Sequence, residues 1–81
     1  MLSKEISDKV LFALLGLTMD EFKRLKCSPL LEYTNKHGVV LEYFVHIDPG
    51  NSRKLLDKLN IKGSYFLTFT VTEVSAVMPK K

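Results

Sequence analysis

The sequence contains one cysteine, Cys27, so no disulfide can form within the chain. Because disulfides are rare in reducing compartments, this composition favours a cytoplasmic protein. The longest apolar run extends from Val10 to Leu15, with Gly16 and Leu17 after it, and is far shorter than the roughly 20 residues that span a bilayer. Acidic side chains among the first residues, with no small-residue cleavage site behind them, argue against a signal peptide. We expect no contact with a membrane.

Metal-binding and catalytic side chains are scarce as well. The two histidines, His37 and His46, lie at the tip and at the end of a predicted hairpin, and Cys27 lies elsewhere. On one strand, Glu42 and His46 are about 13 Å apart, which is too far to share a metal ion. Basic neighbours would lower the pKa of the Cys27 thiol, but its place at the end of a helix opposes thiolate formation. The sequence therefore predicts no metal, no cofactor and no enzymatic activity.

The charge of the chain is unevenly distributed. Residues 1–48 hold six Lys/Arg and seven Asp/Glu, a balance of −1, and residues 49–81 hold six and two, a balance of +4, which together give the net charge of +3. A basic second half favours an acidic partner, although surplus lysines that maintain solubility explain the same balance. At 81 residues we predict a single α+β domain over residues 1–78 and a frayed basic tail over residues 79–81.

Two helices are predicted in the first third of the chain. Ser3 is a suitable N-cap for the first helix, which has apolar side chains almost all round in its second half. Such a helix is buried on more than one side or contacts a second chain. Thr18 and Glu21 have capping-box spacing for a second helix, which ends before Pro29.

The next segments alternate between apolar and polar side chains, which is typical of strands. Residues 30–34 and 39–47 form a predicted hairpin whose turn ends at Gly38 in the left-handed conformation. This turn gives a register with Leu31 opposite Tyr43. All odd-numbered side chains then lie on one core face.

Asn51 or Ser52 can cap a third helix that reaches about Asn60. Residues 64–71 follow as the clearest strand of the chain, and its odd-numbered side chains are predicted to be core. A strand–helix–strand connection makes this strand parallel to residues 39–47, and we favour strand order 2-1-3 over 1-2-3. The prediction is an α+β fold of order ααββαβ, with three helices on one face of a three-stranded mixed sheet.

The second face of this sheet is the first candidate binding surface. Apolar residues rimmed by polar ones mark contact surfaces, although scattered exposed apolar residues are also normal. In the predicted register Glu32 and Glu42 face each other there, and we expect two solvated glutamates rather than an acid–base pair. We predict a non-enzymatic interaction module that forms a homodimer or binds a protein partner through this face or a strand edge. The candidate contact residues are Val40, Phe44, His46, Phe66, Thr68 and Thr70.

A nucleic-acid-binding protein is the alternative. Residues 10–27 have apolar residues and a turn glycine, Gly16, at positions where a helix-turn-helix has them, and a hairpin with a basic tip follows. This stretch resembles part of a winged-helix protein, which implies DNA binding. An αα-hairpin packed in a core explains the same spacing, and the start of the third helix is a candidate anion site. The candidate contact residues are Lys23, Arg24, Lys26, Lys36, His37, Arg53 and Lys54.

Overall fold

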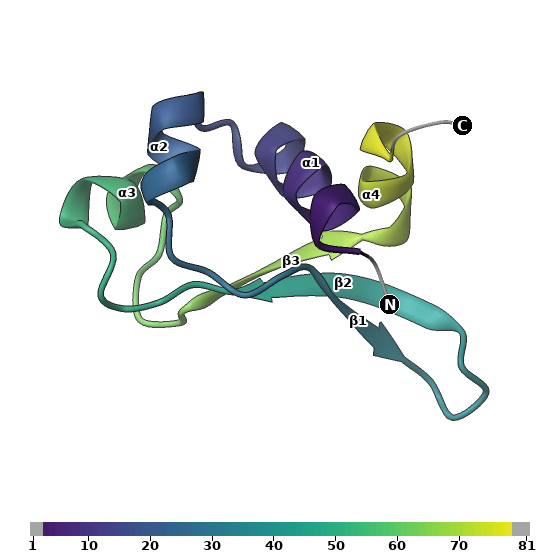
Figure 1. Cartoon of the computed structure of the whole chain (residues 1–81). Helices are drawn as coiled ribbons and strands as arrows, with labels where there is room; N and C mark the ends of the chain where they lie inside the picture. Colours follow the sequence, from purple (N-terminus) through teal and green to yellow (C-terminus); the bar gives the residue numbers. More distant parts are fainter. Residues whose placement is uncertain (1–2, 79–81) are drawn as a thin grey trace.

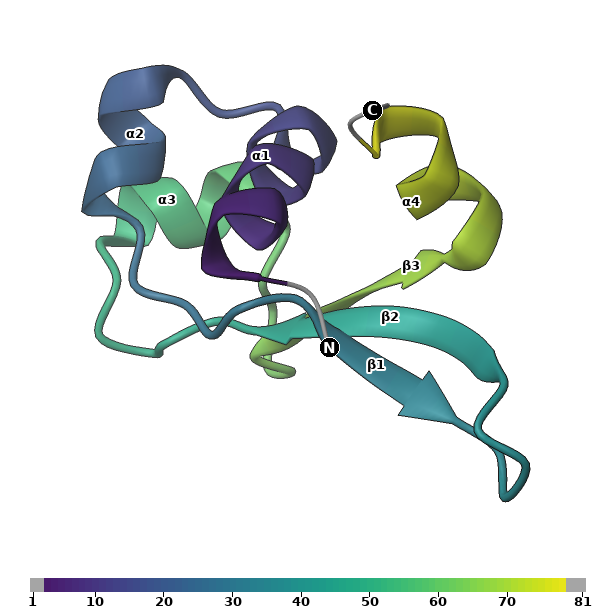
Figure 2. The same ribbon diagram turned by 45° about the vertical axis from the view of Figure 1, so that its right-hand side comes forward.

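A computed structural model describes residues 3–78 of the chain, so the predicted tail over residues 79–81 lies outside the described residues. The fold is α+β, as predicted, with helices on one side of the sheet and the other side uncovered (Figures 1 and 2). The elements are α1 (Lys4–Leu15), α2 (Met19–Arg24), β1 (Leu31–Thr34), β2 (Val40–His46), α3 (Arg53–Lys58), β3 (Phe66–Thr70) and α4 (Val71–Val77).

The three strands form an antiparallel sheet in the order β1-β2-β3. The predicted mixed sheet and the strand order 2-1-3 are therefore wrong. The reason is the length of α3. Its six residues rise about 9 Å, whereas the seven residues of β2 extend about 23 Å, so α3 cannot carry the chain back along the sheet. The chain instead turns round α3 at one end of the sheet and enters β3 antiparallel to β2 (Figure 1).

The register of the β1–β2 hairpin also differs from the prediction. The turn itself is as expected, because Gly38 has a φ of 79° and its N–H donates to the Asn35 carbonyl over 3.0 Å. Thr34 lies opposite Val40, but a bulge follows, and Leu31 lies opposite Phe44 rather than Tyr43. A bulge adds one residue to one strand, and a shift of one residue exchanges the two faces. The bulge therefore places the odd-numbered side chains of β1, Leu31 and Tyr33, on the uncovered face instead of the predicted core face.

A fourth helix follows β3 without a loop. Thr70 is its N-cap: the Glu73 N–H donates to Thr70 Oγ1 over 3.0 Å, and the Thr70 N–H donates to Glu73 Oε1 over 2.9 Å. The prediction that Tyr65 and Val71 are core side chains of a longer strand is wrong, since they are 40% and 38% exposed. Val74 is fully buried instead, and α4 packs against α1, β2 and β3.

The core lies between the helices and the inner face of the sheet. Its fully buried members include Val10 of α1, Val45 of β2 and Val74 of α4. Burying each such side chain contributes about 1.5–3 kcal/mol relative to exposure. The predicted caps at Ser3 and Thr18 are confirmed. The remaining buried hydrophobic residues are Leu11, Leu17, Leu30, Ile47, Leu55, Leu59 and Ile61.

Two buried polar side chains connect the segments around the sheet. Ser7 Oγ of α1 accepts a hydrogen bond from the Leu30 N–H over 2.8 Å, directly before β1. Asn51 accepts from the Lys26 N–H over 2.7 Å, and its amide nitrogen donates to the carbonyls of Lys26 and Asp48 over 2.7 and 2.8 Å. Asn51 therefore fixes the chain after α2 to the chain before α3, while Ser52 is the N-cap of α3.

Candidate functional site

The uncovered face of the sheet, called here the open face, gathers most of the predicted contact residues. The pairing places Leu31, Phe44 and Thr68 in one row across the three strands. Tyr33, Glu42 and Thr70 form the next row, and His46 lies opposite Phe66. A shallow hollow of about 230 Å³ lies over this face and is lined by Tyr33, Glu42, Phe44, His46, Phe66 and Thr68.

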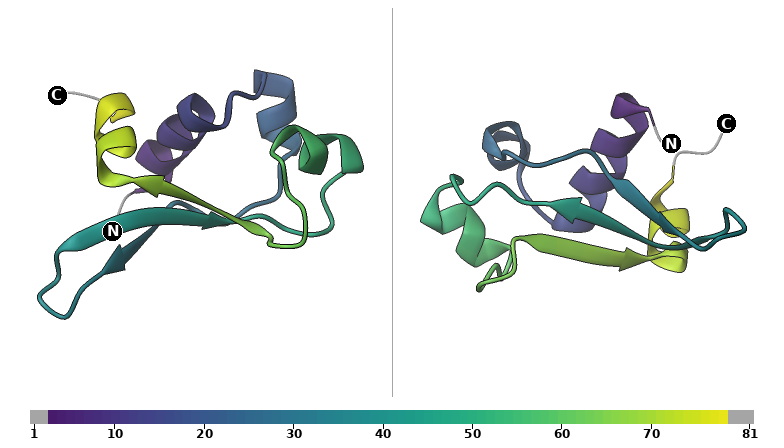
Figure 3. Two further views of the ribbon diagram at one scale, coloured as in Figure 1. Left: turned by 180° about the vertical axis from the view of Figure 1, so that it is seen from behind. Right: turned by 90° about the horizontal axis from the view of Figure 1, so that it is seen from below.

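The aromatic rings of the open face are close together and reach solvent. The Phe44 and His46 rings meet edge to face, with centroids 5.4 Å apart. Phe66 is 48% exposed and Tyr33 is 55% exposed, although both lie within a sheet. No helix of residues 3–78 covers this side (Figure 3). The result is an aromatic cluster that the described part of the chain leaves in contact with water.

One predicted contact residue does not belong to this face. Val40 lies opposite Thr34, which alternation places on the same side as Glu32 and its partner Tyr43. The bulge has therefore moved Val40 away from Phe44. Conversely, Leu31 and Tyr33 belong to the open face, where the sequence-based register did not put them. Their apolar character alone gave no signal, because it fits either face.

The predicted pairing of Glu32 with Glu42 is wrong. Glu32 lies opposite Tyr43, and Glu42 lies opposite Tyr33. Successive residues of a strand alternate between faces, so the two carboxylates lie on opposite sides of the sheet. They cannot act together as an acid–base pair.

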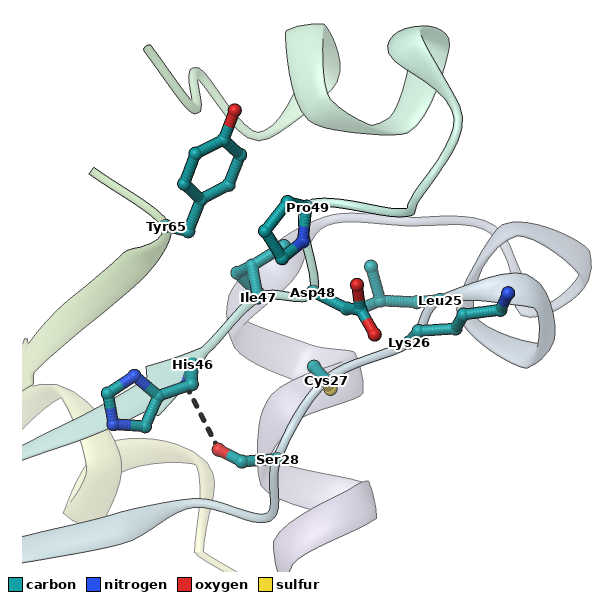
Figure 4. Close-up of a pocket in the computed structure, with 9 residues that line it drawn as sticks. All are labelled: Leu25, Lys26, Cys27, Ser28, His46, Ile47, Asp48, Pro49 and Tyr65. Carbon is teal, nitrogen blue, oxygen red and sulfur yellow. Dashed lines mark hydrogen bonds between the residues drawn. The ribbon is translucent and has the colours of Figure 1, made fainter. Parts of the chain in front are cut away.

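A second, open hollow lies at the end of β2, where Cys27 pairs with Ile47 in an isolated bridge (Figure 4). Ser28 continues this contact: its N–H donates to the His46 carbonyl, and its Oγ accepts from the His46 N–H, both over 2.9 Å. The His46 ring points away from the Cys27 thiol (Figure 4). Burial raises the pKa of the Cys27 thiol, and the negative charge of Asp8 raises it further. The thiol is therefore held protonated.

The residues predicted for the nucleic-acid alternative are divided among several places. Arg24, Lys26 and Lys54 line one hollow of about 260 Å³ between α2 and α3. Lys23 lines a separate groove beside α1. The hairpin tip with Lys36 and His37 lies at the opposite end of the molecule from α2 and α3 (Figure 1), and Arg53 is the first residue of α3.

An ion pair lies beside the hollow that Arg24 and Lys54 line. Lys58 Nζ is 2.6 Å from Glu21 Oε1, which also accepts from the Thr18 N–H over 2.9 Å. The hydrogen bond from Lys58, with that from Thr18, lowers the pKa of the Glu21 carboxyl from 4.5 to about 2. Glu21 thus neutralises part of the positive charge at this end of the molecule and joins α2 to α3.

Residues 3–78 contain neither a metal-binding cluster nor a membrane-spanning helix. Within residues 3–78, no three His, Cys, Asp or Glu side chains lie close enough together to hold a metal ion. None of the helices in that range has the length and apolar content needed to cross a membrane. The chain matches no protein-family model, no curated protein and no solved structure.

Proposed function

We propose that this protein is a non-enzymatic interaction module that binds a second copy of itself or another protein through its sheet. The observation that carries the proposal is the aromatic cluster of Tyr33, Phe44 and Phe66 on the open face. Apolar side chains rimmed by polar ones, here Glu42 and Thr68, are typical of contact surfaces.

The physical basis is the free energy of burying these rings. Fully burying a phenylalanine side chain contributes about 1.5–3 kcal/mol, and aromatic side chains dominate the energetics of interfaces. The Phe44–His46 contact fixes one ring before any partner arrives, which reduces the entropy lost on binding. The protonated Cys27 thiol is a poor nucleophile, which supports a non-enzymatic role. A single cysteine supports our placement of this module in the cytoplasm.

Self-association tests this proposal most directly. Light scattering over a dilution series should show a mass that rises with concentration. In NMR spectra of the same series, the amide signals of open-face residues should change their chemical shifts. Phe44→Ser should weaken association, since it removes a ring from the cluster without opening a core cavity. Leu41→Ser is the matched control, because Leu41 is 51% exposed and does not line the open-face hollow.

The proposal has a clear failure. A strict monomer at millimolar concentration, with no changes in the chemical shifts of open-face amides, would rule out self-association. Binding of a different protein that is equally strong with Phe44→Ser and with Leu41→Ser would remove the open face as the contact surface.

Nucleic-acid binding is the second candidate. The observation that favours it is that Arg24, Lys26 and Lys54 line one hollow. Binding to duplex or single-stranded DNA should weaken steeply with salt, and each of Arg24→Ala and Lys54→Ala should reduce the salt slope by about 1. Lys36→Ala, at the distant hairpin tip, is the control. Fluorescence anisotropy that shows no binding at low salt would eliminate this candidate.

A further inference from the structure

The outer edge of β3 carries backbone groups that nothing in the described chain uses. The Ile47 N–H donates to the Tyr65 carbonyl over 2.8 Å, so Tyr65 directs its groups toward the β2 side. Ladder bonds alternate along an antiparallel pair, and Leu67 and Phe69 therefore also point to β2. Phe66 and Thr68 direct their N–H and C=O groups outward, where residues 3–78 offer them no partner. Figure 3 shows β3 at the margin of the sheet.

This edge also lacks the features that normally prevent pairing. Protected edges carry charges, proline or bulges, or are covered by another element. The sequence of β3, F-L-T-F-T, contains no charged residue and no proline, and its pairing with β2 is regular. The helix that follows it, α4, packs against α1, β2 and β3 and lies on the helix side of the sheet (Figure 1).

We infer that β3 pairs antiparallel with β3 of a second copy, about a two-fold axis at Leu67, to form one continuous six-stranded sheet. The inference rests on the proposed function, because it names the partner and the contact for an interaction module.

The register follows from which outward groups are available. Thr70 cannot take part fully, since its N–H is bonded to Glu73 and its carbonyl accepts the first bond of α4. A pair centred on Thr68 would set Phe66 against Thr70 of the second copy and lose that bond. A pair centred on Leu67 sets Phe66 against Thr68 of the second copy, so all the free outward groups of both residues are used.

The side chains of this register are complementary as well. On the open face Phe66 lies beside Thr68 of the second copy, and the two aromatic clusters become one surface. On the helix side the two Leu67 side chains meet at the axis, and Phe69 lies opposite Tyr65 of the second copy. Tyr65 is 40% exposed in the single chain. Aromatic side chains directly opposite each other on neighbouring strands stabilise the pairing of those strands.

A second copy fits this edge better than an unrelated strand for two reasons. Two-fold pairing brings together strands without charge, so no like charges face each other across the ladder. The free groups are also self-complementary, because each copy offers a donor and an acceptor at both Phe66 and Thr68. A closed two-fold dimer is the commonest form of homo-oligomer.

Amide hydrogen exchange of the unmodified chain tests the inference. In dilute solution the Phe66 and Thr68 amides should exchange fast, whereas those of Leu67 and Phe69 are protected. At concentrations where light scattering shows a dimer, exchange at Phe66 and Thr68 should slow by about tenfold or more. A dimer whose Phe66 and Thr68 amides remain fast would overturn the pairing.

Cysteine cross-linking tests the register. With Cys27→Ala as background, Leu67→Cys should form a disulfide-linked dimer, because residues at the axis have Cα atoms about 4.5 Å apart. Thr68→Cys is the control, since its two copies are offset by about 7 Å along the strands. Preferential cross-linking at Thr68 overturns the Leu67 register. Circular dichroism verifies that each variant is folded.

Thr68→Pro separates this inference from the proposed function. The Thr68 N–H points away from β2, so proline removes no bond within one chain but should weaken dimerisation about 10- to 100-fold. Thr68→Val changes the side chain but keeps the backbone N–H, so it measures the effect of the side chain alone and should weaken dimerisation much less than Thr68→Pro. If Phe44→Ser abolishes association and Thr68→Pro does not, the β3 pairing is wrong and the open-face proposal stands. A strict monomer in every variant overturns both forms of self-association.

Discussion

The two outer strands of the sheet, β1 and β3, have similar lengths, but their outer edges differ in the features that hinder pairing with another strand. Alternation along the ladder directs the Leu30 N–H away from β2, and Ser7 of α1 accepts it there. β1 also contains a charged residue, Glu32, has Pro29 shortly before it, and pairs with β2 through a bulge whose extra residue, Leu41, lies in β2. β3 has a regular register and no charge. The β1 side of this sheet therefore has a backbone bond to α1 and a charged side chain, and the β3 side has neither among the described residues.

The largest effect we expect from this comparison is in amide exchange of the dilute monomer. The Leu30 amide is bonded to a buried serine, whereas the Phe66 and Thr68 amides point away from β2 and have no acceptor within residues 3–78. Leu30 should therefore exchange at least about 100-fold more slowly than Phe66 and Thr68. NMR-detected exchange measures all three. Equal rates would mean that the two edges do not differ.

Ser7→Ala should remove the hydrogen bond that joins α1 to the backbone directly before β1. It leaves the Leu30 N–H buried without an acceptor, which costs about 1–3 kcal/mol in the free energy of unfolding and removes the protection of that amide. Urea denaturation measures the loss. Ser75→Ala, at an exposed serine of α4, is the control and should change stability by less than about 0.5 kcal/mol. A loss no larger than that of the control would contradict the role of Ser7.

Thr70→Ala tests where the uncharged edge ends. Thr70 is both the last residue of β3 and the N-cap of α4, and losing an N-cap side chain costs about 1 kcal/mol. Thermal and urea unfolding should show this loss, and the control Thr72→Ala, at the second residue of the same helix, should not. If both variants lose equal stability, the cap is not what ends the strand.

The smallest effect we expect concerns the ion pair between α2 and α3, the helices that precede the two outer strands. Lys58, in the helix before β3, lowers the pKa of Glu21, in the helix before β1, to about 2. A lowered carboxyl pKa stabilises the fold above the ordinary value of 4.5, and this contribution is lost as pH falls from there toward 2. Lys58→Met should reduce the acid dependence of unfolding in that window.

The control for this experiment is Lys62→Met, an exposed lysine outside the pair. It should keep the acid dependence of the unmodified chain. Urea midpoints measured between pH 2 and 7 compare the variants. If the curves of Lys58→Met and Lys62→Met coincide, the ion pair does not couple α2 to α3.

The features that were predicted correctly from the sequence are those that depend on interactions between residues close together in the chain. Caps at Ser3 and Thr18 and the left-handed turn residue Gly38 each depend on a few neighbouring atoms, and all three are present. The T-x-x-E pattern at Thr70 was equally local. It was missed because Val71 fits both the alternation of a strand and the first position of a helix.

Long-range features could not be predicted in the same way. Thr34 lies opposite Val40, as the turn requires, but the register shifts at the next residue. Nothing in the local residue types distinguishes the two registers, because Leu31 and Tyr33 are apolar enough for either face. The direction of β3 depended on how far six residues of α3 reach, and the helix had been expected to continue to about Asn60. Because of the wrong register, Val40 was predicted to lie on the open face, and Leu31 and Tyr33 were not predicted to lie there.

The difference between the two edges has a consequence for stoichiometry. Pairing through β3 uses the unprotected edge of both copies and leaves two β1 strands outermost, each only four residues long, with the charged Glu32 in it and with Ser7 of α1 bonded to the backbone directly before it. Such margins do not template another strand. Association through this sheet would therefore saturate at two chains rather than propagate into a fibre, and the light-scattering mass should reach a plateau at high concentration.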